Sequence, residues 1–388
     1  MAQPIPKRIR ENKPELAQEK YTTLLVDGSN ILELSMRGCR QTSSNGDEVG
    51  GIFQFLLQLK IMLHKGNFRH VYVFWDGENS GELRYRLNSD YKANRDKSYD
   101  DADLSDYMKA VNERIRSMQK YFRQKKGGGA QSANDEKELF HRQRDAVMDC
   151  LEELFVRQCV CELTEADDFI GYYVKNKEQN ERIVIMSNDR DLTQLIADDV
   201  IVYVQSMKKF INTKNHREEM GYSHENVLLK KMLCGDTSDN IKGVKGLGEK
   251  TLFTNFPEIR EKKVTLEEVI RKAEMINENR AAEKKKPLVW ASNIVNGVTD
   301  GAQGGKLYDI NRKIIDLSDP LMTDESKELM DSLMHHPMDP EGRTFENLYK
   351  IICEIGIDEL RDESKFGGFF ADFNVLIENE KKFAKKFS

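Results

Sequence analysis

Three carboxylates stand directly ahead of an apolar segment in CELTEADDFIGYYV, residues 161–174. Glu165 and Asp168 are three positions apart and would share one face of a helix, with Asp167 beside them. Thr164 is the expected N-cap, and the helix dipole favours acids in the first turn by about 0.3–1 kcal/mol each. Helix capping alone would explain this motif if no other acids converged on it.

Other acids stand at the ends of short β-branched and aromatic runs, where a strand would end at the edge of a sheet. They are Asp27 in TTLLVD (22–27), Asp76 in HVYVFWD (70–76), and Asp189 in RIVIMSND (182–189), with Asp191 two residues later. A lone aspartate at such a position is usually a turn former. Parallel strands bring their carboxyl ends to one edge, however, and repelling carboxylates gathered there need a positive charge to stay ionised. Oxygen ligands without His or Cys favour a hard cation such as Mg²⁺ or Mn²⁺.

A further pair of acids precedes a glycine-rich turn in LCGDTSDNIKGVKGLGEKTL, residues 233–252. The pair is Asp236 and Asp239, the glycines are Gly243, Gly246 and Gly248, and Lys250 and Thr251 open the next expected helix. Backbone N–H groups at a helix start can bind phosphate without reading base sequence. A glycine turn is commonly only a loop, but its attachment to two more acids favours a functional interpretation.

The elements that would position these acids alternate between strand and helix as far as about residue 210. The runs 22–27, 70–76, 182–189 and 199–206 indicate strands, and GGIFQFLLQLKIML (50–63) indicates a helix between two of them. This alternation predicts a largely parallel sheet with helices on both faces. Beyond it the pattern becomes helical and more polar.

Composition indicates the class of protein. A length of 388 residues predicts roughly two domains. With 32% charged residues, no long apolar stretch and no signal peptide, we expect a soluble, cytoplasmic protein without membrane contact. The six cysteines show no paired CxxC spacing, so they are interpreted as reduced packing residues.

The net charge of −6 averages over basic clusters that could attract nucleic acid. One cluster contains Arg84, Arg86, Lys92 and Arg95, interleaved with Tyr85 and Tyr91. A second contains Arg114, Arg116, Lys120, Arg123, Lys125 and Lys126, with Tyr121 and Phe122 inside it. A solvated helix face explains such runs equally well when they stand alone. The second cluster lies in a long charged insertion, residues 96–145, interrupted by three glycines at 127–129.

The motifs taken together resemble a known family. The ordered set LLVDGSN, FWDGENSGELRYRLNSDYKANR, EADD, SNDRDLTQL and GDTSDNIKGVKGLGEKT is similar to the structure-specific 5′ nucleases. These include flap endonucleases, the 5′-exonuclease domains of bacterial DNA polymerases, and phage 5′-to-3′ exonucleases. The later segments YDINRKIIDLSDPLM (308–322) and FENLYKIICEIGIDEL (345–360) look most like the ribonuclease H of T-even-type bacteriophages.

The resemblance implies a role for each motif residue. The tighter metal site would be built or supported by Asp27, Asp76, Glu165, Asp167 and Asp168. The second would be held or organised by Asp189, Asp191, Asp236 and Asp239. Lys92 and Arg95 would contact the scissile phosphate from the base of a helical arch, residues 96–145, lined by the basic clusters. Two Mg²⁺ or Mn²⁺ ions and a K⁺ ion at the glycine hairpin are the implied cofactors.

The implied fold is a Rossmann-like (PIN-like) α/β domain followed by a helical domain. We expect a basic arm at 1–20, a catalytic domain at 21–215, and a helical DNA-binding domain at 216–388 with a helix-hairpin-helix motif near 225–256. The implied partners are DNA and RNA–DNA hybrids with 5′ ends or flaps, a single-strand-binding protein and a sliding clamp, with a monomeric chain. The basic arm at 7–10 and FGGFF (366–370) are candidate tethers, although packed phenylalanines are an equally good interpretation of the latter.

The predicted activity is divalent-metal-dependent hydrolysis near 5′ ends, which would remove primer RNA during lagging-strand synthesis. A phosphatase of the haloacid-dehalogenase type needs a second Asp two residues after the first, but Asp27 is followed by Gly28 and Ser29. A small PIN-type ribonuclease would lack the arch and the hairpin. A catalytically weak junction-binding module would explain the hairpin and the basic runs but not the acids.

Overall fold

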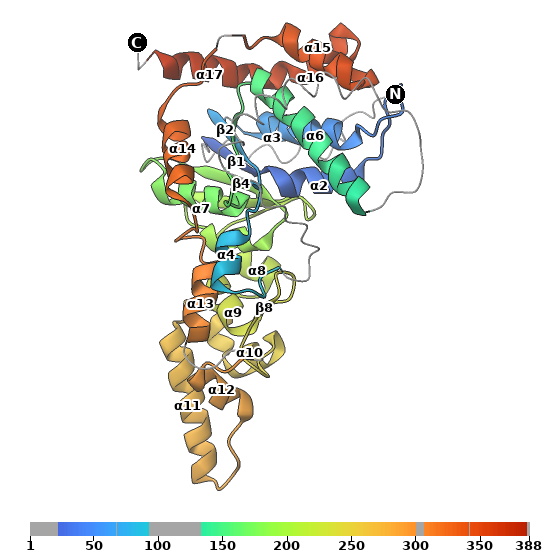
Figure 1. Cartoon of the computed structure of the whole chain (residues 1–388). Coiled ribbons are helices and arrows are strands. Elements are labelled where there is room, and N and C mark those ends of the chain that lie inside the picture. The colour runs from blue at the N-terminus through green and yellow to red at the C-terminus, as the bar shows by residue number, and fades with distance from the viewer. Residues whose placement is uncertain (1–21, 67, 93–132, 300–305, 341, 386–388) are drawn as a thin grey trace.

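A computed structural model describes residues 22–66, 68–92, 133–299, 306–340 and 342–385. Figure 1 shows a broad lobe built around a sheet and a narrower lobe of helices, with α4 (Glu82–Leu87) and α13 (Lys306–Ile315) between them. The predicted basic arm at 1–20 and most of the predicted arch, up to residue 132, lie outside the described ranges. Within those ranges, none of the helices has the length and apolar character needed to cross a bilayer.

The sheet has six strands in the order β3-β2-β1-β4-β5-β6. They are β1 (Thr23–Asp27), β2 (His70–Phe74), β3 (Arg157–Cys159), β4 (Ile183–Ser187), β5 (Val200–Val204) and β6 (Lys209–Ile211). All neighbouring pairs are parallel except β5 and β6. The chain adds β2 and β3 on one side of β1 and then returns to add β4 on the other. The strand order therefore reverses between β1 and β4, where open α/β sheets place their sites.

The four predicted strands and the parallel sheet are confirmed, but β3 and β6 were not predicted. Each has three residues, and a run that short carries no readable alternation. The predicted helix at 50–63 is confirmed as α3 (Gly50–Lys65).

Successive strand residues face opposite sides of the sheet and build two cores. Leu24 and Val26 belong to the core covered by α2 (Gly28–Gly38), α3 and α6 (Ala133–Glu153). Leu25 belongs to the opposite core, covered by α7 (Ala166–Asn176), the 3-10 helix η3 (Arg190–Leu195) and α14 (Asp324–His335). Burial on both faces fixes the strand register, because a slip of one residue would exchange the two faces.

The narrower lobe has its own apolar core, which includes Leu233, Phe256 and Val269. Its elements are α8 (His216–Met220), η4 (His224–Asn226), α9 (Val227–Cys234), β7 (Gly235–Asp236), β8 (Ile241–Lys242), α10 (Glu249–Asn255), η5 (Pro257–Arg260), α11 (Leu266–Ala282) and α12 (Val289–Asn296). The helix-hairpin-helix corresponds to α9, the β7–β8 hairpin and α10. A capping box between Thr265 and Glu268 fixes the start of α11, the helix that reaches the far end of this lobe (Figure 1).

The C-terminal helices return to the sheet lobe. They are α15 (Phe345–Ile355), η6 (Asp358–Leu360), α16 (Glu363–Phe370), η7 (Ala371–Phe373) and α17 (Asn374–Ala384), and they lie along the upper side of that lobe in Figure 1. Phe369 and Phe370 are buried in the core shared with α3, and Arg157 of β3 donates to Glu380 of α17 at 2.6 Å. The sequence analysis assigned this segment to the helical domain. An amphipathic pattern shows that one face of a helix is buried, but it does not show which part of the protein that face packs against.

The tether interpretation of FGGFF is therefore wrong, and the alternative of packed phenylalanines is confirmed. The expected state of the cysteines is also confirmed, since all six are unpaired. The other predicted domain boundaries stay predictions.

Candidate metal centre

The site begins at the carboxyl end of β1, where Asp27 caps α2. Its Oδ1 accepts from the N–H of Asn30 at 3.1 Å, and its Oδ2 accepts from the hydroxyl of Ser187, at the end of β4, at 2.8 Å. Asp27 thus spans the point where the strand order reverses. Burial, followed by repulsion from Asp76, raises its pKa from 3.8 to about 8 although both hydrogen bonds lower it.

Three more carboxylates surround Asp27. Asp76 follows β2, and its Oδ1 accepts from the N–H of Ala166, the first residue of α7, at 2.9 Å. Burial and then the charges of Asp189 and Asp27 raise the pKa of Asp167 well above its usual range. Burial also raises the pKa of Asp189, against the attraction of Lys231.

We call Asp27, Asp76, Asp167 and Asp189 the unpaired set. In the part of the chain that the structure describes, none of these four forms an ion pair with a lysine or arginine. Carboxylates that repel one another in this way take up protons or bind a cation. The residues present therefore fit a divalent metal ion.

The neighbouring acids are neutralised by the protein itself. The guanidinium of Arg84, on α4, donates to both oxygens of Asp168 at 2.5 and 2.9 Å and lies 2.9 Å from Glu165 Oε2. Glu165 also accepts from the hydroxyl of Tyr91 at 3.0 Å and from the ammonium of Lys92 at 2.5 Å. Burial would raise the pKa of Glu165, but the charges of Arg84 and Lys92 outweigh it and lower the pKa to about 2.

These contacts correct two predicted roles and bear on a third. Arg84 and Tyr91 are only 4% and 3% exposed, so neither presents its side chain to DNA. Asp168 is fully buried, and its Oδ1 also accepts from the N–H of Leu321; these contacts fit the supporting role that the resemblance allows. Sequence spacing placed Arg84 in a basic cluster and could not show that it turns inward.

The predicted cap of α7 is also wrong by one residue. Glu165 is the N-cap and makes no side-chain capping bond, while the hydroxyl of Thr164 lies 2.6 Å from that of Ser326 on α14. The side chain of Asp76 accepts from the first turn of α7 instead. A capping group from a distant strand has no local sequence signal.

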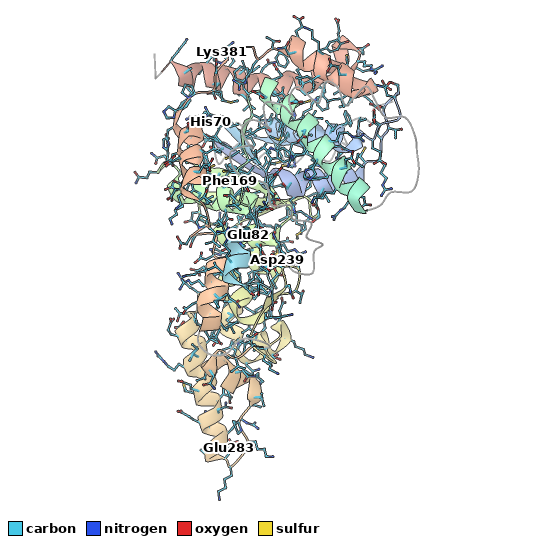
Figure 2. All side chains as sticks on the ribbon, viewed as in Figure 1. His70, Glu82, Phe169, Asp239, Glu283 and Lys381 are labelled. Atoms are coloured by element: carbon cyan, nitrogen blue, oxygen red, sulfur yellow. The ribbon has the colours of Figure 1, made fainter. Side chains whose placement is uncertain are left out.

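A second group of acids lies at the junction of the lobes, where Figure 2 labels Asp239. Asp191, Asp236 and Asp239 each offer one oxygen within 4.8 Å of the others. The ammonium of Lys231, on α9, contacts Asp191 and lies 2.6 Å from Asp236 Oδ2. Burial would raise the pKa of Asp236, but Lys231 and Ser238 lower it to about 2. Lys231 was missed because it stands outside the acid and glycine motifs.

Lys92 joins the two groups of acids. Its side chain reaches Glu165, and its backbone N–H donates to the carbonyl of Asp239 at 2.8 Å. Its φ of +50° is unusual for a residue with a side chain, and such conformations concentrate at functional sites. Arg86, by contrast, is exposed on α4 and pairs with Glu82 at 3.1 Å.

The glycine hairpin makes a tight turn between α9 and α10, as its glycine spacing predicts. Gly246 has a φ of +79°, and a Cβ on Gly243 would lie 2.2 Å from the carbonyl carbon of Cys234, so the hairpin needs both glycines. Gly248 caps α10 and faces open space, with Lys250 exposed and Thr251 half-buried in the first turn.

The remaining predicted residues lie outside the described ranges. They are Arg95, Arg114, Arg116, Lys120, Tyr121, Phe122, Arg123, Lys125 and Lys126. Their roles stay predictions.

Comparison with known proteins gives a consistent result. A family model described as "5'-3' exonuclease, N-terminal resolvase-like domain" matches residues 22–221. The chain is 28% identical over 243 residues to a 5′-3′ exonuclease of Halalkalibacterium halodurans, covering 59% of this chain and 67% of that protein. It is 31% identical over 260 residues to DNA polymerase I of Bacillus subtilis, covering 65% of this chain but only 25% of the polymerase.

Among solved structures, the 5′-exonuclease of T5 with bound zinc matches with a TM-score of 0.54 at 15% identity. The match covers 92% of this chain and 99% of that one. At this identity the likeness concerns the fold: a mostly parallel sheet with helices on both faces and an attached helical lobe.

Proposed function

The chain belongs to the 5′-3′ exonuclease family, whose members include flap endonucleases and are metal-dependent nucleases, and from this premise we propose the substrate and the residues that act on it. We propose that it hydrolyses phosphodiesters near the 5′ ends of RNA–DNA and DNA–DNA duplexes and of 5′ flaps, and so removes primer RNA during replication. The single observation that carries this proposal is the unpaired set: one buried and three half-buried carboxylates that repel one another at the strand-order reversal.

Two divalent ions, Mg²⁺ or Mn²⁺, are the proposed cofactors. Asp27, Asp76 and Asp167, with Asp189 beside them, would hold one ion, and Asp191, Asp236 and Asp239 the other. Ions held by these carboxylates would lower the pKa of an attacking water and neutralise the leaving oxygen. Arg84, Tyr91 and Lys92 hold Glu165, and Arg84 also holds Asp168, so the first turn of α7 keeps its position when the ions bind or leave.

Lys92 is the proposed catalytic cation, together with Arg95. The side chain of Lys92 is 23% exposed, so its ammonium can exchange part of its contact with Glu165 for a phosphate oxygen. It would stabilise negative charge that develops on the phosphate in the transition state. One preorganised donor of this kind contributes about 3 kcal/mol.

The glycine hairpin and α10 would contact the duplex backbone, with a K⁺ ion at the hairpin. We propose contacts with a single-strand-binding protein and a sliding clamp, a monomeric state, and a place in the cytoplasm. The predicted arch would admit a free 5′ end, and a bulky protein on that end should then slow cleavage. Equal rates on blocked and open flaps would show that threading is not needed.

A gel assay tests the proposal. Purified protein is incubated with 5′-flap DNA, a nicked RNA–DNA hybrid and single-stranded DNA, each with Mg²⁺, Mn²⁺ or EDTA. We expect divalent-dependent release of short 5′ products from the flap and the hybrid. Binding to the flap without divalent-dependent cleavage of any substrate would favour the junction-binding module instead.

A further inference from the structure

Lys231 lies inside the second acid group and not beside it. Its ammonium contacts Asp191 and is 2.6 Å from Asp236 Oδ2, and its side chain is only 10% exposed. The two acids come from different lobes: Asp191 stands in η3 against the sheet, and Asp236 in the β7–β8 hairpin. The ammonium therefore joins the two lobes at two of the three carboxylates that would hold a metal ion.

We propose that Lys231 is an internal cation that holds Asp191 and Asp236 together before a divalent ion binds, and that the ion displaces it from them. Lys231 would then be a positioning residue that keeps the second metal site assembled and makes its affinity weaker than that of the unpaired set. This inference rests on the proposed function, because it takes Asp191, Asp236 and Asp239 as metal ligands.

Competition follows from the sizes of the two cations. Mg²⁺ sits about 2.0–2.1 Å from its oxygen ligands, and the ligand oxygens here all lie within 4.8 Å of one another. An ion among them would occupy nearly the same place as the ammonium, and two positive charges so close in a half-buried site repel strongly. The four-carbon stem of a lysine is flexible enough for the ammonium to leave.

The contrast with the unpaired set supports the same conclusion. Asp27 and Asp167 have no lysine or arginine partner among the described residues, whereas the ammonium of Lys231 contacts both Asp191 and Asp236. The carboxylates of Asp27 and Asp167 gain most from the first divalent ion. At Asp191 and Asp236, Lys231 already neutralises part of the negative charge, so a divalent ion adds less stabilisation there.

The test measures Mn²⁺ binding to the full chain by calorimetry, without DNA. In the wild type we expect two ions, the second binding more weakly. Lys231→Met should tighten the second binding step by at least about tenfold, which corresponds to about 1.4 kcal/mol. The same variant in EDTA should melt at a lower temperature than the wild type, with most of the loss recovered in Mn²⁺.

Lys230→Met is the matched control. Lys230 is the preceding residue on α9, and its ammonium pairs with Glu249, away from the acids. Its loss should leave both Mn²⁺ binding steps unchanged. An equal effect of the two variants would show a general loss of positive charge and overturn the inference.

A second measurement uses the unaltered protein, so it holds even if Lys231→Met fails to fold. Amine acetylation followed by mass spectrometry should label Lys231 several-fold faster in saturating Mn²⁺ than in EDTA, with labelling of Lys230 unchanged. Slow labelling of Lys231 in both conditions would overturn the displacement.

The outcomes separate this inference from the proposed function. A wild-type protein that binds no ion at Asp191, Asp236 and Asp239 would overturn the proposed second metal site, and this inference with it. An ion that binds there equally well in the wild type and in Lys231→Met would overturn this inference alone.

Discussion

Two sets of carboxylates lie side by side at the sheet edge and differ in what neutralises them. Glu165 and Asp168 are paired with Arg84 and Lys92; the pKa of Glu165 falls to about 2, while burial still raises that of Asp168 against the attraction of Arg84. In the unpaired set, burial and mutual repulsion raise the pKa of Asp27 to about 8 and that of Asp167 well above its usual range.

The difference separates acids that build the site from acids that await a ligand. A buried carboxylate with an arginine partner fixes the position of a helix but has little left to offer a metal ion. A carboxylate held among other acids is electrostatically destabilised in its charged form until a cation binds. Strongly shifted pKa values of this kind are typical of functional sites.

Asp167→Asn should lower kcat on a 5′-flap substrate by at least about a thousandfold, because an amide no longer supplies the charge that holds a divalent ion. In EDTA the variant should be at least as stable as the wild type, since one source of buried repulsion is removed. Flap-cleavage kinetics and thermal melting check the two effects. Near-normal turnover would remove Asp167 from the metal ligands.

Asp168→Asn should destabilise the fold by about 3–5 kcal/mol, because it removes the carboxylate that pairs with both guanidinium nitrogens of the buried Arg84 and leaves only Glu165 to neutralise it. Urea unfolding in EDTA measures the change. The control is the double variant Arg84→Met with Asp168→Leu, which removes both charges and should recover much of the lost stability. A single variant as stable as the wild type would contradict the division between the two sets.

The sequence predicted the parallel sheet and the acids that gather at its edge, because strand-ending aspartates and short apolar runs are local signals. It could not predict which acids are paired. Arg84 reaches Asp168 across 84 positions and Lys231 reaches Asp191 across 40, and neither distance leaves a local pattern. The same limit applies to Thr164, whose expected capping role is taken by Asp76, and to α15–α17, whose apolar faces pack on the sheet lobe.

Lys92→Ala should lower kcat by about a hundredfold or more while changing Mn²⁺ affinity much less, because its ammonium acts on the phosphate and not as a ligand. Single-turnover cleavage and Mn²⁺ titration measure the two quantities. Arg86→Ala is the control, since Arg86 is an exposed cation on the nearby helix α4. Equal losses in rate and in metal affinity would make Lys92 a structural partner of Glu165.

The stability of the protein in EDTA should also depend on pH through Asp27, in the unpaired set, but not through Glu165, which is paired with Arg84 and Lys92. The folded-state pKa of Asp27 is raised from 3.8 to about 8, so its contribution to stability is present below pH 3.8 and is lost as pH rises through about 8. Between pH 5 and pH 9, Asp27→Asn should therefore gain about 1–3 kcal/mol relative to the wild type, as measured by urea unfolding.

Glu165→Gln provides the matched comparison. The lowered pKa of Glu165 means that its contribution is lost only as pH falls from 4.5 toward about 2. The effect of this variant should stay constant from pH 5 to pH 9. Parallel pH profiles for the two variants would show that Asp27 and Glu165 are in equivalent environments.

The most direct test of the division is to locate bound ions by anomalous scattering from crystals of the full chain grown with saturating Mn²⁺. One peak should lie in contact with oxygens of Asp27, Asp76 or Asp167, and a second among Asp191, Asp236 and Asp239. No ion should lie on Asp168, whose oxygens remain with Arg84. An ion coordinated by Asp168, or the absence of any peak at the unpaired set, would contradict the division.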